Sequence, residues 1–132
     1  MRYLLDANVC VDYLNGRFPS VAAKLQSLAP EEVAISVVAV AELRFGADKS
    51  ARAEANHHRL DLFLGDVAVL DFERDAARAY GSLRAALERS GTPIGPNDML
   101  IAAQALAAGT VLVSANLDEM RRVPGLAVES WR

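Results

Sequence analysis

The sequence predicts an α/β fold organised around a mostly parallel β-sheet. Short apolar runs with strand character alternate with segments of helical periodicity along the whole chain. The 132 residues contain no internal repeat or low-complexity linker, and their 52% hydrophobic content is enough for one ordinary core. We therefore expect residues 1–132 to form a single domain.

The chain opens with a strand and two helices. Residues 3–5 form a short apolar run that is typical of a buried strand. Residues 8–14 carry apolar side chains at helical spacing, and Gly16 is expected to stop that helix. Ser20 is expected to cap a second helix, which ends by Pro30.

The middle of the chain continues the alternation. A strand is predicted over 33–36, and a helix over 38–47 because its alanine, glutamate, leucine and arginine residues favour helices. A further helix is expected over 51–64 and a strand over 67–70. Residues 73–89 form the clearest amphipathic helix, with apolar side chains at every third or fourth position.

The last third contains the most apolar helix. Glycines and prolines predict a loop over 91–96, and residues 98–108 form a helix that is apolar on nearly all sides and therefore buried. A strand is predicted over 111–113, a helical turn over 118–122 and a last strand over 126–128.

Composition excludes several classes of protein. The net charge of −3 argues against wholesale electrostatic wrapping of nucleic acid, although a local basic patch or a bound metal remains compatible with it. The one cysteine excludes an intramolecular disulfide, and no Cys/His cluster has zinc spacing. No apolar stretch resembles a signal peptide or a membrane span, so we expect a cytoplasmic protein without membrane contact.

Polar side chains follow or flank segments that should be buried. Asp6 comes directly after the first predicted strand, and Asn116 follows the fourth. Glu42 lies inside an apolar stretch, and Asp98 opens the most apolar helix. Ligands of open α/β sheets bind at the carboxyl ends of the strands, and a buried carboxylate needs a partner, a raised pKa or a metal. These four residues are therefore the candidate catalytic residues.

The chemistry of these side chains points to a hard divalent cation. Carboxylates and water are the ligands that Mg²⁺ and Mn²⁺ prefer. Carboxylates alone would repel a phosphodiester, whereas a bound divalent ion can activate water and stabilise the developing charge. The sequence therefore favours metal-assisted hydrolysis at this edge of the sheet.

Each residue also has an ordinary structural role. Asp6 could cap the first helix, and Asp98 could interact with a helix macrodipole. Glu42 could pair with Arg44 or reach solvent at a helix edge, and Asn116 could be a turn residue. The expected position of all four residues at one edge of the sheet favours a shared site.

Other reactive residue types receive structural interpretations. His57 and His58 are adjacent on a helix and are expected to be a solvated pair. Cys10 is expected to pack in the core. Trp131 is expected to pack onto the core from the C-terminal end, and Arg84 to be a surface arginine.

The chain resembles the VapC-type PIN domains in four segments that occur in the family's order. Residues 3–10, YLLDANVC, are similar to the family's LLDTNIC opening. Residues 35–47 resemble its second motif, with a central Glu, and residues 94–102 its third, with a central Asp. Residues 112–116, together with 122–126, resemble its fourth motif and closing phrase.

This resemblance implies a PIN-like three-layer α/β/α fold and a Mg²⁺- or Mn²⁺-dependent endoribonuclease. Asp6, Glu42 and Asp98 would form the acidic cluster, with Asp6 and Asp98 as direct metal ligands. Asn116 falls where many PIN domains carry an acid, and Glu119 at a further acidic position.

The resemblance also implies partners. Members of this family act as toxins of type II toxin–antitoxin pairs, dimerise, and are silenced by a VapB-like antitoxin. Their targets are structured RNAs, with initiator tRNA the best known of them. We therefore expect a homodimer, a cognate antitoxin and an RNA substrate such as tRNA.

The sequence departs from the family pattern at two positions. Ala7 stands where the family carries Thr or Ser, so a hydroxyl that could orient metal or water is absent. Asn116 adds no charge, so a second ion would be held weakly. Both changes keep open a catalytically impaired PIN domain that only binds RNA or antitoxin.

Two other α/β classes also gather acids at strand ends. A receiver domain needs a lysine near the late strands, but no lysine follows Lys49. A haloacid-dehalogenase-like phosphatase needs Asp-x-Asp after the first strand, and Asn8 occupies the second position here.

Overall fold

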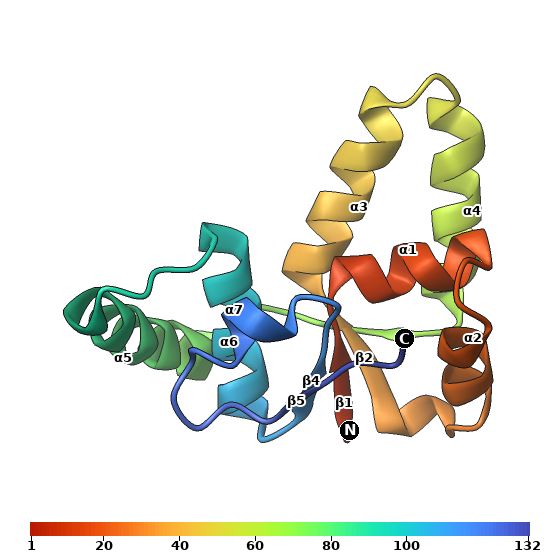
Figure 1. Cartoon of the computed structure of the whole chain (residues 1–132). Coiled ribbons are helices and arrows are strands. Elements are labelled where there is room, and N and C mark those ends of the chain that lie inside the picture. The colour runs from red at the N-terminus through yellow and green to blue at the C-terminus, as the bar shows by residue number, and fades with distance from the viewer.

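The computed structural model describes all of residues 1–132 and has one five-stranded sheet (Figure 1). Every neighbouring pair of strands is parallel, and the strand order is β3-β2-β1-β4-β5. The strands are β1 (Tyr3–Leu5), β2 (Val33–Ser36), β3 (Ala68–Leu70), β4 (Val111–Val113) and β5 (Val128–Glu129). The predicted α/β class is confirmed, and the sheet is parallel throughout.

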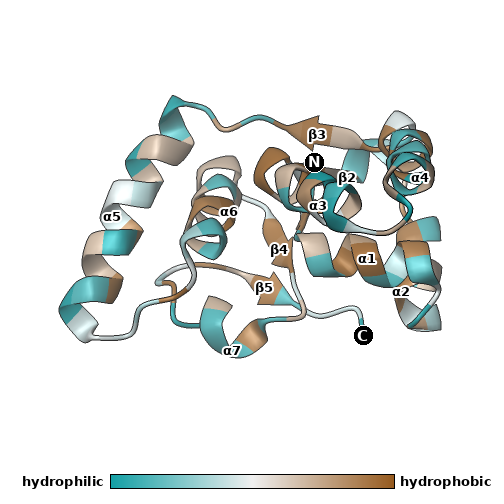
Figure 2. Ribbon diagram, turned by 90° about the horizontal axis from the view of Figure 1, so that it is seen from above, coloured by the Kyte–Doolittle hydropathy of each residue, from teal (hydrophilic) through white to brown (hydrophobic).

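Seven α-helices and one 3₁₀ turn, Pro30–Glu32, connect the strands. The helices are α1 (Ala7–Asn15), α2 (Pro19–Gln26), α3 (Val37–Lys49), α4 (Ala53–Gly65), α5 (Arg74–Ser90), α6 (Pro96–Ala108) and α7 (Leu117–Met120). Seen from above, α5 and α6 lie on one side of the sheet and α1 and α2 on the other (Figure 2). The expected three-layer arrangement is therefore confirmed.

The α3–α4 hairpin stands above the edge of the sheet at which the strands end (Figure 1). It rises beside α1, which starts directly after β1. The first residues of α1 and α3 are therefore brought together at the carboxyl edge of the sheet.

The core consists of the strands and the helix faces that cover them. Leu4, Leu5, Ile35 and Leu112 are completely buried, as expected for strands covered on both faces. Helix α6 is buried along most of its length, as its all-round apolar sequence predicts. Neither α6 nor any other helix is both long and apolar enough to span a bilayer.

One polar side chain of α6 lies in this core. Gln104 accepts a hydrogen bond from the Ser36 hydroxyl and donates one to the carbonyl of Leu70 at 2.9 Å. Because a buried amide needs partners, this residue connects α6 to the ends of β2 and β3.

Several predicted boundaries differ from the structure by one or two residues, and two of the differences can be traced to specific hydrogen bonds. Helix α2 begins at Pro19, and Ser20 does not cap it; the Ser20 hydroxyl instead donates to the carbonyl of Trp131 at 2.7 Å. The last strand pairs Val128 with Leu112 and Glu129 with Val113, so it starts two residues later than expected. The cause is a turn that still includes Leu126, whose N–H donates to the carbonyl of Val123.

The expected structural roles of two other residues are confirmed. Cys10 is completely buried. Trp131 is 7% exposed and packs edge-on against Tyr3, with 5.3 Å between the ring centroids.

An ion pair between a buried carboxylate and an exposed arginine joins α1 to the end of the chain. Asp12 is 2% exposed and accepts hydrogen bonds from Arg132 Nε at 2.7 Å and Nη2 at 3.1 Å. The guanidinium also lies 4.5 Å from the ring centroid of Phe18. A nearly buried carboxylate without this partner would be strongly unfavourable.

We expect Arg132→Ala to lower the free energy of unfolding by about 2 kcal/mol, because the Asp12 carboxylate loses both charged donors. Urea denaturation followed by circular dichroism measures the loss. Arg121→Ala is the control, because Arg121 is exposed and forms no ion pair. Equal stability of the two variants would contradict this role of the pair.

Candidate active site

The strand order places a switch point between β1 and β4, because the chain leaves these neighbouring strands in opposite directions. Ligand sites of open α/β sheets lie outside the carboxyl ends of the strands at such a point. Leu5 pairs with both Ile35 and Val113. The next residue of each strand segment, Asp6, Ser36 or Ser114, therefore lies at the same edge, and all three are buried.

Asp6 lies at the centre of this edge. One oxygen, Oδ1, accepts from the N–H of Ala7 at 2.6 Å and so caps α1. The other, Oδ2, accepts from the Ser114 hydroxyl at 2.9 Å. Burial raises the pKa of Asp6, and these two hydrogen bonds partly oppose that rise. The predicted capping role therefore coexists with a second carboxylate oxygen at the strand ends.

Glu42 comes from the second turn of α3. Ser36 starts this helix by accepting from the N–H of Val38 at 3.0 Å, so the helix rises directly from β2. Burial and the charge of Asp6 raise the pKa of Glu42, whereas a hydrogen bond from Asn97 lowers it. Its Oε1 is buried and has no hydrogen-bond partner.

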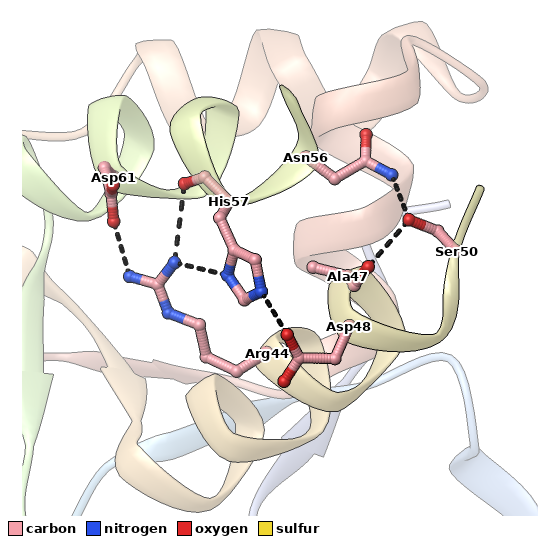
Figure 3. A network of polar contacts seen from close by, with 7 residues as sticks. All are labelled: Arg44, Ala47, Asp48, Ser50, Asn56, His57 and Asp61. Atoms are coloured by element: carbon pink, nitrogen blue, oxygen red, sulfur yellow. Dashed lines mark hydrogen bonds and ion pairs between the residues drawn. The ribbon is translucent and has the colours of Figure 1, made fainter. Parts of the chain in front are cut away.

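The alternative pairing of Glu42 with Arg44 is wrong. Arg44 donates to Asp61 at 2.6 Å and to His57 Nδ1 at 3.0 Å, both on α4 (Figure 3). Glu42 therefore faces the site without a cationic partner.

The same contacts correct the interpretation of the histidines. His57 is not part of a solvated pair, because its Nε2 also bonds Asp48 at 2.7 Å (Figure 3). The ring thus connects two side chains of α3 from its position on α4, and it fastens the two helices of the hairpin together.

Asp98 is the third residue of α6. Gly95 precedes the helix, and a Cβ at this glycine would lie 3.3 Å from Asp98 Oδ2. The glycine therefore leaves room for the carboxylate to fold back over the helix start. Burial raises the pKa of Asp98 to about 6, with further contributions from the charges of Asp6, Glu119 and Glu42.

Asn116 connects two of the acids. Its Nδ2 donates to Asp98 Oδ2 at 3.3 Å and to Glu119 Oε2 at 3.0 Å, and its own N–H donates to Ser114 Oγ at 3.0 Å. The structure thus brings all four predicted site residues, and Glu119, to one edge of the sheet.

The side chains of the site are of the type that binds a divalent cation, because they are carboxylates without a cationic partner. None of its four acids forms an ion pair with Lys, Arg or His. The charge of Asp6 contributes to the raised pKa of Glu42 and of Asp98. No three Asp, Glu, His or Cys side chains are gathered closely enough to surround one ion. An ion here would therefore have fewer than three of these side chains as ligands and would need water to complete its shell, as Mg²⁺ commonly does.

Two contributing residues were not predicted. Ser114 donates its hydroxyl to Asp6 from the end of the other strand at the switch point. Asn97 favours the charged form of Glu42. The available signal was their sequence position, because Ser114 directly follows β4 and Asn97 directly precedes Asp98.

The acids at the switch point of this parallel sheet define a class of α/β domains with an acidic site at the strand ends. The PIN domain model matches residues 3–126, and the chain therefore belongs to the PIN-domain family. Within it, the chain is 41% identical over 132 residues to Ribonuclease VapC2 of Rickettsia felis, covering 99% of this chain and 98% of that protein.

One further sequence comparison and one structural comparison also match this chain to VapC proteins over nearly its full length. The tRNA(fMet)-specific endonuclease VapC of Salmonella typhimurium is 36% identical over 131 residues, which cover 99% of this chain and 98% of that protein. The crystal structure of VapBC2 from Rickettsia felis bound to a promoter DNA fragment contains a chain that superposes with a TM-score of 0.93 at 39% identity, with both chains fully covered. The predicted resemblance to VapC ribonucleases is confirmed.

The raised pKa of Asp98 makes the stability of the metal-free protein depend on pH. The folded state binds more protons than the unfolded state between the ordinary pKa of 3.8 and about 6, so this group costs stability as pH rises through that window. We expect Asp98→Asn to raise the melting temperature in EDTA more at pH 7 than at pH 5. An equal effect at both pH values, by differential scanning fluorimetry, would contradict this electrostatic description.

Ser114→Ala tests the hydroxyl that holds Asp6. The variant leaves Asp6 Oδ2 buried without its donor, which should cost about 1–3 kcal/mol of stability at pH 7. The loss should be smaller at a lower pH, because burial raises the pKa of Asp6 and a larger protonated fraction of Asp6 needs that donor less. Chemical denaturation at the two pH values measures it, and a loss that is independent of pH would indicate a packing role alone.

Proposed function

We propose that residues 1–132 act as a single PIN domain with metal-dependent endoribonuclease activity, as the toxin of a type II toxin–antitoxin pair. The observation that carries this proposal is the group of carboxylates at the switch point, which has no cationic side chain to neutralise it. Its support from relatives is that proteins named ribonuclease VapC match over nearly their full length.

In this proposal Asp6 and Asp98 hold one Mg²⁺ or Mn²⁺ ion. Each has a carboxylate at the carboxyl edge of the sheet, and the charge of Asp6 raises the pKa of Asp98. When bound, the ion would activate water and neutralise the charge of the phosphodiester.

The remaining residues of the site position the carboxylates and the attacking water. The Ser114 hydroxyl fixes the Asp6 carboxylate, and the Asn116 amide fixes that of Asp98. Glu42 has a free buried oxygen, which can accept a hydrogen bond from the attacking water. Hydrolysis then breaks a P–O3′ bond and leaves a 5′-phosphate.

The partners follow from the relatives. A Salmonella relative is named for tRNA(fMet), and we propose a structured RNA such as initiator tRNA as substrate. A Rickettsia relative was crystallised as a VapBC2 complex, and we propose a cognate VapB-like antitoxin that silences this chain in the cytoplasm. We also propose that the chain forms a homodimer, as the family resemblance implies. Analytical ultracentrifugation of the purified chain tests this prediction.

The test is cleavage of total RNA by the purified, antitoxin-free chain with Mg²⁺, Mn²⁺ or EDTA. We expect discrete products with metal and none with EDTA. Asp6→Asn and Asp98→Asn should each reduce the rate by at least about 100-fold, since several kcal/mol of charge stabilisation is lost and each factor of ten corresponds to about 1.4 kcal/mol.

Asp118→Asn is the matched control, because Asp118 lies on α7 beside the site but is exposed. It should cleave like the unaltered protein. Full activity in both Asp6→Asn and Asp98→Asn would overturn the assignment. Folded protein that binds RNA or antitoxin but cleaves nothing with either metal would favour the binding-only alternative.

A further inference from the structure

A hollow of about 440 Å³ lies between α1, α3 and α4 and is continuous with the carboxylate site. Glu42 and Ala7, the neighbour of Asp6, belong to its lining. A group seated in it would therefore lie next to the phosphate on which the site acts.

The polar part of the lining consists of neutral amides. Asn8 and Asn15 of α1 and Asn56 of α4 line the hollow, and the first two make no hydrogen bond through their side chains within the chain. Asn56 is fixed by donating to the Ser50 hydroxyl at 2.9 Å, so its oxygen is presented as an acceptor (Figure 3). Carboxamides provide both donors and acceptors, as the edges of nucleobases require.

The rest of the lining suits a flat aromatic ring next to a phosphate. Val11 is 41% exposed and contributes apolar surface together with Leu60. Arg59 is the hollow's positively charged residue, and it is held by donating to the carbonyl of Leu14 at 2.5 Å. A guanidinium beside a nucleobase can bind the adjoining backbone phosphate.

The hollow is preformed by the hairpin contacts. The Arg44, His57 and Asp48 side chains hold together α3 and α4, two of the three helices that form the hollow. A larger hollow of about 650 Å³ is different, because its lining is mostly apolar and includes none of the four site acids.

We propose that the hollow beside Glu42 binds one unstacked nucleobase of the substrate RNA, next to the bond that is cut. Single-stranded RNA is recognised by splaying bases out and hydrogen-bonding their edges. This inference rests on the proposed ribonuclease function and makes the hollow a determinant of cleavage specificity.

Gly46→Leu tests the inference by filling the hollow. Gly46 lies in α3 and lines the hollow, and a Cβ there meets no atom within 4 Å. The side chain can therefore enter open space, and replacement of a helical glycine favours the helix. Gly65→Leu is the matched control, because its Cβ also meets open space and it lines neither hollow.

The measurement is cleavage of an RNA library with randomised bases around the cut site, followed by sequencing of the 5′ ends. The unaltered protein and Gly65→Leu should prefer one base at a single position adjacent to the cut. Gly46→Leu should lose this preference and cleave the preferred RNA at least about 10-fold more slowly, whereas an abasic nucleotide at that position should remove the difference.

Asn15→Ala provides a second variant that needs no repacking, because Asn15 is exposed. It should weaken the same base preference while leaving the dependence on metal concentration unchanged. Unchanged preference and rate in both variants would overturn the inference. So would variants that cleave normally but no longer bind antitoxin, since the hollow would then be a peptide site. Absence of cleavage by the unaltered protein would instead overturn the proposed function itself.

Discussion

Mutual repulsion among carboxylates at the end of a parallel sheet is the constraint on which the rest of this structure depends. The charge of Asp6 raises the pKa of both Glu42 and Asp98, and the charge of Glu42 adds to the rise at Asp98. No Lys, Arg or His forms an ion pair with these carboxylates. Such a group opposes folding in the absence of a cation. The fold tolerates it because the surrounding strands and the middle of helix α6 are well buried and the buried Asp12 carboxylate is paired with Arg132.

The chain orients these carboxylates with neutral donors rather than with cations. A hydroxyl from Ser114 holds Asp6, and the Asn116 amide holds Asp98. Neutral donors fix the direction of a carboxylate but leave its negative charge available to a metal. This explains how the two departures from the family pattern, Ala7 and Asn116, are compatible with an organised site.

The sequence allowed the order of elements, and the position of the four candidate residues at one edge of the sheet, to be predicted, because both depend on local patterns. Apolar runs mark the strands, and acids that follow or flank them fall at the carboxyl edge. The contacts that complete the site depend on register between distant strands. The Ser114–Asp6 bond spans 108 residues, and it could be found only when β1 and β4 were known to be neighbours. His57 was misinterpreted for the same reason, since its partners lie on α3.

The most direct test of the central claim is calorimetric titration of Mn²⁺ into the metal-free protein at pH 6, in two buffers of different ionisation enthalpy. The account predicts saturable binding that releases protons, because the pKa of Asp98 is raised to about 6. It also predicts that Asp6→Asn abolishes both the binding and the proton release. Mn²⁺ binding of equal strength in the unaltered protein and in Asp6→Asn, without proton release, would contradict the account.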